Sequence, residues 1–133
     1  MENVGELFSR YAESYQATFM NMTLYDDTYD AFCSLVEKEN PRIFEIGCGP
    51  GNITRYLLSQ RPDFRIEATD LSSGMIDLAR KNVPEAVFRE LDCRNLDELQ
   101  THFDGIICGF CIPYLSQESC RKLIADCSGL LYK

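Results

Sequence analysis

The sequence has no tryptophan, one histidine and no long apolar stretch without charges. A helix that spans a bilayer needs about 20 consecutive apolar residues, so we predict no membrane segment. The first residues, MENVGELFSRYAESY, carry charges where a secretory signal would need an apolar stretch. Together these absences predict a cytoplasmic protein.

Basic residues are also scarce, because 13 Lys and Arg face 21 Asp and Glu for a formal net charge of −8. The basic residues are scattered along the chain and form no stripe, and an acidic surface repels phosphate backbones. We therefore predict no nucleic-acid partner. The charge is compatible with a small-molecule substrate.

The seven cysteines are an odd number and follow no export signal, so we expect reduced thiols and no disulfides. CGFC, from Cys108 to Cys111, has the spacing of a thioredoxin-type redox pair. Such a pair is activated at a helix N-terminus, whereas this one ends a predicted strand, which disfavours redox catalysis. A single histidine and the lack of a second close cysteine pair predict no metal site.

The chain of 133 residues is 45% hydrophobic and 26% charged, as expected for one globular domain. From Arg42 onward, short apolar runs alternate with stretches of helical spacing in the order β-α-β-α-β, followed by β-α. This order predicts an α/β fold with a doubly wound parallel sheet covered by helices on both faces. Before Pro41 we expect a helix that ends near Asn40, with a buried stripe formed by Tyr25, Tyr29, Phe32 and Val36.

The C-terminal part of the sequence predicts a last helix after the strand FDGIICGF. Ser72 and Ser116 suit helix N-caps. The predicted buried stripe of the last helix is Cys120, Leu123, Ile124, Cys127 and Leu131. Because no strand follows, the strand FDGIICGF would be an exposed edge. We therefore expect either a fragment of a longer protein or a homo-oligomer that covers this edge.

The stretch EIGCGPGN places Gly47, Gly49 and Gly51 between a predicted strand and a predicted helix. In a doubly wound sheet the ligand binds at this edge, where glycines let the backbone approach it and the helix N-terminus favours an anion. A dinucleotide-binding turn would carry a further glycine where Asn52 stands, so the motif argues against NAD. An ordinary strand-to-helix turn remains the alternative.

Acidic residues follow the next two strands. Asp70 ends RIEATD, where a carboxylate accepts hydrogen bonds from the two hydroxyls of a ribose. Asp92 and Cys93 follow the third strand, where an acceptor and a backbone N–H could read the edge of an adenine. Alternatively, Asp70 simply precedes a helix and Asp92 lies in a solvated loop. Their occurrence together after the glycine turn favours one nucleoside ligand.

The series EIGCGPG, ATDLSSGMIDLAR, ELDCRNL and FDGIICGF resembles the class I, Rossmann-like S-adenosylmethionine-dependent methyltransferases. The resemblance extends from about residue 40 to the C-terminus. It implies an incomplete methyltransferase fold whose first four strands have the order 3-2-1-4. It also implies S-adenosylmethionine as cofactor, S-adenosylhomocysteine as product, a cofactor-binding core at residues 41–133 and a helical lid at residues 1–40.

The resemblance also assigns roles to residues. Glu45 and the Gly47–Gly49 backbone would hold the methionine part of the cofactor, with Cys108 and Gly109 beside its amino group. Asp70 would bind the ribose, whereas the residues around the adenine would be Leu71, Met75, Asp92 and Cys93. The cofactor-binding set is therefore Glu45, Gly47, Cys48, Gly49, Asp70, Leu71, Met75, Asp92, Cys93, Cys108 and Gly109.

Three tyrosines are candidates for the lid and the acceptor pocket. Tyr11 and Tyr15 would belong to the lid, although aromatics at helical spacing, like Met75, also suit a core. Tyr114 would line the acceptor pocket. Its segment, from Cys111 to Tyr114, shares only Pro-Tyr with the Asn/Asp-Pro-Pro-Tyr motif of enzymes that methylate amino groups of DNA bases. His102 precedes the fourth strand, at the opposite end of the sheet, and we expect it on the surface.

The sequence thus predicts a methyltransferase that transfers a methyl group to a small-molecule acceptor, with no clear general base. Two alternatives remain. A non-catalytic module would bind the cofactor or a partner without turnover, and an NAD-dependent oxidoreductase would bind NAD more tightly than S-adenosylmethionine. Neither the acceptor nor the oligomeric state follows from the sequence.

Overall fold

Four parallel strands form the centre of the molecule. The computed structural model describes residues 3–20, 22–109 and 111–132. The strand order is β3-β2-β1-β4, which confirms the predicted doubly wound, Rossmann-like order 3-2-1-4. Phe110, part of the predicted fourth strand, lies outside the described residues. The strands are β1 (Arg42–Ile46), β2 (Arg65–Asp70), β3 (Val87–Glu90) and β4 (Gly105–Cys108).

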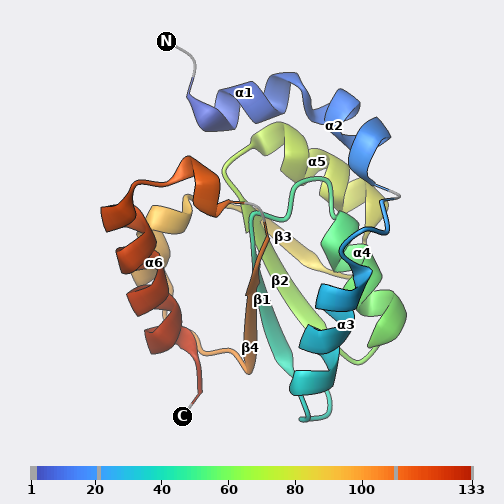
Figure 1. The fold of residues 1–133 in the computed structure, drawn as a ribbon, viewed down its shortest axis with the longest axis vertical. Coiled ribbons are helices and arrows are strands. Elements are labelled where there is room, and N and C mark those ends of the chain that lie inside the picture. Colours follow the sequence, from blue (N-terminus) through green and yellow to red (C-terminus); the bar gives the residue numbers. More distant parts are fainter. Residues whose placement is uncertain (1–2, 21, 110, 133) are drawn as a thin grey trace.

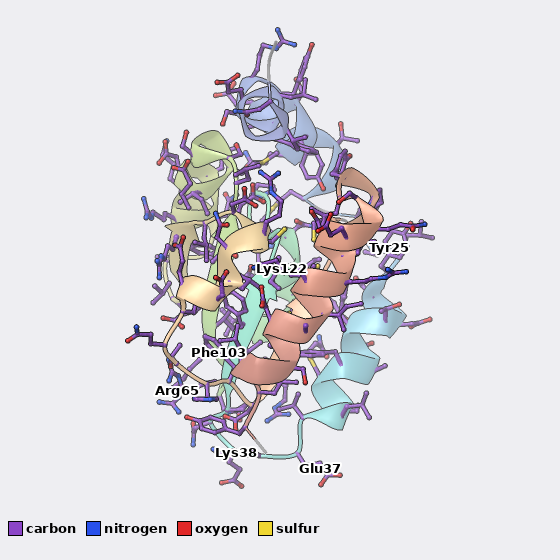
Figure 2. All side chains as sticks on the ribbon, turned by 90° about the vertical axis from the view of Figure 1, so that its left-hand side faces the viewer. Tyr25, Glu37, Lys38, Arg65, Phe103 and Lys122 are labelled. Atoms are coloured by element: carbon purple, nitrogen blue, oxygen red, sulfur yellow. The ribbon has the colours of Figure 1, made fainter. Side chains whose placement is uncertain are left out.

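Helices cover both faces of the sheet (Figure 1). The helices on one face are α3 (Asp26–Leu35), α4 (Asn52–Gln60) and α5 (Ser73–Asn82). The other face carries α6 (Gln117–Leu130) and the 3₁₀ helix η1 (Cys93–Glu98). Figure 2 shows α6 beside η1, where Lys122 Nζ donates to Asp97 Oδ1 at 2.8 Å.

Three short elements lie near the carboxyl ends of the strands. Two of them, α1 (Val4–Arg10) and α2 (Ala12–Phe19), cross this end of the sheet (Figure 1). The third is the 3₁₀ helix η2 (Ile112–Tyr114), which follows β4. The N-terminal segment therefore covers the edge at which the sequence predicts the ligand.

Strand β1 supplies side chains to two apolar cores, because successive residues of a strand point to opposite faces. Ile43 belongs to the core under α3, α4 and α5. Phe44 and Ile46 belong to the core under α6, where the Phe44 ring stacks on Phe103 at a centroid distance of 4.8 Å. This alternation places Glu45 on the α4 side, where it is fully buried.

Helix α3 ends at Leu35, so the predicted end near Asn40 is wrong. Arg61 explains the early end, because its Nη1 donates to the carbonyls of Cys33 and Val36 at 3.0 and 2.7 Å. A cation that binds the last carbonyls of a helix stabilises its C-terminus. Tyr25, the first residue of the predicted stripe, precedes the helix and is 39% exposed.

Ser72 and Ser116 are N-caps, as predicted, since their side chains accept hydrogen bonds from the N–H groups of Met75 and Ser119. The predicted stripe of the last helix is wrong at Ile124, which is 66% exposed, and at Leu131, which follows the last residue of α6. Buried Leu123 faces the sheet, and each following residue lies about 100° further round a helix. Ile124 therefore points away from the sheet.

After the last helix the chain pairs with the segment that precedes β4. Leu131 forms a parallel bridge with Phe103, and the Phe103 N–H donates to the Leu130 carbonyl at 2.8 Å. This pairing lies at the amino end of β4. Among the described residues, no helix is both long and apolar enough to cross a bilayer. His102 is exposed, as predicted.

Candidate functional site

The glycine turn requires glycine for both its backbone conformation and its packing. Gly47, Gly49 and Gly51 have φ angles of 72°, 54° and 92°, and residues with a side chain rarely adopt such values. A Cβ atom at Gly51 would lie 3.1 Å from Val83 Cγ2, and one at Gly47 would lie 3.2 Å from Cys111 Cβ. The turn is therefore held tightly between the end of α5 and the segment after β4.

Hydrogen bonds join this turn to the carboxyl end of β2. The N–H groups of Gly47 and Cys48 both donate to the Thr69 carbonyl, at 2.9 and 3.0 Å. The Gly49 N–H donates to Asp70 Oδ2 at 2.9 Å. These three N–H groups therefore have acceptors within the protein, and the Gly49 bond holds the Asp70 carboxylate against the turn.

Asp70 lies in the wall of a cavity with both of its oxygens already engaged. Oδ2 accepts from Gly49, and Oδ1 accepts from the Ser72 N–H at 2.9 Å. Burial raises the pKa of this carboxyl group, whereas the backbone N–H groups lower it. Since each carboxylate oxygen can accept a second hydrogen bond, Asp70 can also accept hydrogen bonds from two ligand hydroxyls.

Glu45 is a buried acid beneath the glycine turn. Its Oε1 accepts from Thr54 Oγ1 of α4, and its Oε2 has no partner. The pKa of Glu45 is raised to about 8, mainly by burial and in part by Asp70, against the Thr54 hydrogen bond, which lowers it. An unpartnered buried acceptor is costly, and a cationic donor near it would reduce that cost.

The loop after β3 carries Asp92 and Cys93. Asp92 caps η1 by accepting from the Arg94 N–H at 2.9 Å, and it also forms an ion pair with the Arg94 side chain. This pairing lowers the pKa of Asp92. Asp92, Cys93 and Arg94 all lie in the cavity wall. Met75, in the same wall, is 1% exposed and therefore also belongs to the core.

Aromatic side chains from both ends of the chain meet above the cavity. The Phe8 ring packs edge-on against Tyr15 at 6.1 Å and against Tyr114 at 5.3 Å between centroids. Ser9 fastens α1 to α5, because its Oγ lies 2.7 Å from Ser72 Oγ and accepts from the Gly74 N–H at 3.2 Å. The N-terminal helices thus form a roof over the cavity.

The cavity has a volume of about 620 Å³ and lies at the carboxyl ends of the strands. The sequence-predicted residues that line it come from five separate segments of the chain. They are Tyr15, Gly47, Gly49, Asp70, Leu71, Met75, Asp92, Cys93, Gly109 and Tyr114.

Four predicted residues do not line this cavity. Cys48 is 1% exposed and packs in the core, so its side chain cannot reach a ligand there. Tyr11 is 51% exposed, beside the Arg10 guanidinium. Glu45 is buried beneath the turn, and the Cys108 sulfur lies against Cys111.

The sequence reasoning missed several residues of the wall. Phe8 precedes Tyr15 by seven residues, and this spacing, which places two residues on one helix face, could have indicated it. Arg94 gave no such signal, because its place depends on how Asp92 caps η1. The full set of missed residues is Asn3, Val4, Phe8, Ile46, Leu91, Arg94, Cys111, Leu115, Ser116 and Ser119.

The fold and the site define a class of protein that comparison with known proteins identifies. The family described as "Methyltransferase domain" matches residues 43–133, and the chain belongs to this family. A malonyl-[acyl-carrier protein] O-methyltransferase of Acetivibrio thermocellus is 34% identical over 102 residues, or 75% of this chain and 36% of that protein. A demethylmenaquinone methyltransferase of Thermotoga maritima is 27% identical over 128 residues, or 94% of this chain and 55% of that protein.

Solved structures share the fold. DesVI of Streptomyces venezuelae superimposes with a TM-score of 0.75 at 21% identity, over 92% of this chain and 53% of that one. A TehB-like S-adenosylmethionine-dependent methyltransferase of Corynebacterium glutamicum gives 0.72 at 23% identity, over 96% and 66%. The chain thus spans about one third to two thirds of the length of these four proteins.

Proposed function

We propose that this chain forms the cofactor-binding part of an S-adenosylmethionine-dependent methyltransferase that acts on a small-molecule acceptor. One observation carries the proposal: a single cavity is lined by the glycine turn, by Asp70 at the end of β2 and by Asp92 and Cys93 after β3. The match to the methyltransferase family and the similarity to enzymes of this class support it.

The chemistry of the wall fits the parts of this cofactor. Asp70 would accept hydrogen bonds from the ribose hydroxyls, and Met75 and Leu71 would contact the adenine. Asp92 and Cys93 would read the edge of the base. Gly47, Gly49 and Gly109 would leave room for the methionine part, and the unpartnered Glu45 oxygen would favour its ammonium group.

The bound cofactor would supply an electrophilic methyl group on its sulfonium. The task of the chain is therefore to hold donor and acceptor in line and to exclude water, for which positioning supplies most of the rate enhancement. Phe8, Tyr15 and Tyr114 would do this, because their rings pack together in the part of the wall that lies outside the predicted cofactor contacts. Tyr15 is a poor general base, since burial raises its pKa, as do nearby Asp70 and Tyr114.

The acceptor is a small molecule in this proposal. An aromatic roof over the cavity suits a compact substrate, and a net charge of −8 disfavours nucleic acid. Residues 1–40 would act as the lid and residues 41–133 as the cofactor core. The roof formed by Phe8 and Tyr15 supports this division, with Tyr15 rather than Tyr11 as the lid tyrosine.

Calorimetric titration with S-adenosylhomocysteine tests the proposal, with NADH as the control ligand. We expect micromolar binding of S-adenosylhomocysteine and none of NADH. Tighter binding of NADH would contradict the cofactor class. Binding of S-adenosylhomocysteine without turnover of any acceptor by the full-length protein would favour the non-catalytic alternative.

A further inference from the structure

Cysteines gather where β4 ends against the cavity. Four of the seven cysteines pack into the core between the sheet and α6, and they are Cys93, Cys108, Cys111 and Cys127. The sulfurs of Cys108 and Cys111 are 2.8 Å apart. Cys111 also lines the cavity.

The other thiols lack this arrangement. Cys33 and Cys48 are buried in the opposite core, and the Cys120 sulfur lies 4.0 Å from the Ile112 carbonyl oxygen. Within the described part of the chain, no group of three or more histidine, cysteine or acidic side chains is arranged to hold a metal ion. The close pair is therefore better explained by sulfur chemistry than by metal binding.

A disulfide at this position needs little movement. The sulfur atoms of a disulfide are about 2.05 Å apart, so the two sulfurs would have to approach by less than about 1 Å. Neither thiol is sealed in the interior, since both residues are only partly buried. The cavity gives a small oxidant access to the pair through Cys111.

We propose that Cys108 and Cys111 form a reversible disulfide in the wall of the cavity when a peroxide oxidises them, and that this bond weakens cofactor binding. The second half rests on the proposed function, whereas the first half does not. Nothing in the motif that predicts cofactor binding requires these two thiols to touch.

The reaction proceeds in two steps with hydrogen peroxide as the oxidant. The Cys108 thiolate attacks one peroxide oxygen, the O–O bond breaks, and hydroxide leaves and takes up a proton to become water. The Cys111 sulfur then attacks the sulfenic sulfur of Cys108, the S–O bond breaks, and a second water leaves with the Cys111 proton. Two thiols are oxidised to one disulfide, and one peroxide is reduced to two waters.

The two thiols differ in acidity in a way that suits these roles. The hydrogen bond from Cys111 lowers the pKa of the Cys108 thiol, although burial opposes the shift. The same contact raises the pKa of Cys111 to about 12, against a hydrogen bond with Cys93 that lowers it. Since the thiolate is the nucleophile in thiol oxidation, Cys108 attacks first and Cys111 resolves.

Oxidation alters the site because Cys111 lies in the cavity wall with two residues that are predicted to contact the cofactor, Gly47 and Cys93. The Cys111 Cβ packs near Gly47, where an added Cβ would lie only 3.2 Å away. Drawing the Cys111 sulfur toward Cys108 therefore moves a side chain that packs against the glycine turn. By linkage, a bound cofactor then disfavours the disulfide by the same coupling free energy.

The test treats the protein with hydrogen peroxide, alkylates the remaining thiols and maps them by mass spectrometry. Cleavage after lysine and arginine gives a peptide of residues 95–121, which carries Cys108, Cys111 and Cys120. Cys120→Ser simplifies the mapping and is the matched control. We expect the peptide to lose the mass of two hydrogen atoms, with dithiothreitol restoring it. Cys108→Ser and Cys111→Ser should abolish the loss, while circular dichroism checks their folding.

The second readout is titration with S-adenosylhomocysteine before and after oxidation. We expect the oxidised protein, and the oxidised Cys120→Ser variant, to bind about fivefold more weakly or worse, with recovery after reduction. A disulfide elsewhere, or none, overturns the inference, and so does a Cys108–Cys111 disulfide that leaves the affinity unchanged. Lack of binding by the reduced protein would instead refute the proposed function, while the mass readout would still decide whether the disulfide forms.

Discussion

The N–H of Gly49 donates to Asp70 Oδ2 at 2.9 Å, and this bond joins the glycine turn to the acid at the end of the next strand. The two residues belong to separate sequence motifs. Their contact means that the turn holds the Asp70 carboxylate in place before any ligand arrives, and a preorganised group binds its ligand at a lower entropic cost.

Replacing Asp70 by alanine should weaken binding of S-adenosylhomocysteine by about 2–3 kcal/mol, the range for hydrogen bonds to a charged group. The N–H groups of Gly49 and Ser72 would lose their acceptor, so the melting temperature should also fall. Calorimetry and thermal unfolding measure the two effects. The matched control is Asp77→Ala on the exposed side of α5. Unchanged affinity in Asp70→Ala would refute the ribose assignment.

Glu45 should make stability depend on pH. Its pKa in the folded protein is about 8, against the ordinary glutamate pKa of 4.5. Between pH 4.5 and pH 8 the folded state keeps a proton on Glu45 that the unfolded state has lost. The stability that this pKa difference contributes is therefore fully present below about pH 4.5 and is lost as pH rises through 8. Glu45→Gln keeps the site neutral. The stability of this variant relative to the original protein should therefore rise from pH 5 to pH 9.

Chemical denaturation of both proteins across this range measures the difference. The variant should also bind S-adenosylhomocysteine more weakly at pH 8, because an amide cannot attract an ammonium group as a carboxylate does. A pH-independent stability difference would contradict the raised pKa of Glu45. The affinity of Glu45→Gln at pH 8 is measured independently of this result.

Gly5 lets α1 lie close to the cavity wall. A Cβ atom here would lie 2.9 Å from the Leu71 carbonyl oxygen. Gly5→Ala should therefore displace α1 and cost about 1 kcal/mol of ligand affinity, or roughly fivefold. Gly129→Ala is the control, because nothing lies within 4 Å of its Cβ position. It should leave affinity unchanged and stabilise α6 by about 0.5–1 kcal/mol. If Gly5→Ala and Gly129→Ala changed the affinity equally, α1 would not form the roof of the cavity.

Tyr15 and Tyr11 should behave differently although both were predicted in the lid. Tyr15 lines the cavity and packs against Phe8, whereas Tyr11 is half exposed outside it. Tyr15→Ala should weaken S-adenosylhomocysteine binding by on the order of 1 kcal/mol, the worth of an aromatic pair. Tyr11→Ala should have little effect. If Tyr11→Ala weakened binding more than Tyr15→Ala, the described roof would be wrong.

Local patterns predicted the parts of the fold that depend on neighbours in sequence. Alternating strand and helix signals predicted a parallel sheet with helices on both faces, and the resemblance to methyltransferases implied its order 3-2-1-4. Ser72 and Ser116 were recognisable as caps, since a cap bonds to a backbone group only three residues away. The place of Asp70 followed from its position at the end of a strand.

Distant contacts explain the failures. Helix α3 ends early because of Arg61, which lies 25 residues after the Val36 carbonyl that it binds. Ile124 fits an apolar stripe in sequence, yet the packing of Leu123 against the sheet turns it to solvent. Periodicity identifies an apolar side of a helix, but the neighbouring elements select which residues of that side are buried.

The sequence by itself determined the parallel sheet, the glycine turn and the carboxylates at the strand ends, because each depends on local backbone preferences and on the pleat of a strand. Only the tertiary structure decided the roof over the cavity and the contact of Cys108 with Cys111. Phe8 and Tyr114 lie far apart in the sequence, yet their rings pack against each other. Such a contact depends on how α1 packs against α5 and on where the segment after β4 turns, and neither leaves a periodic signal in the sequence.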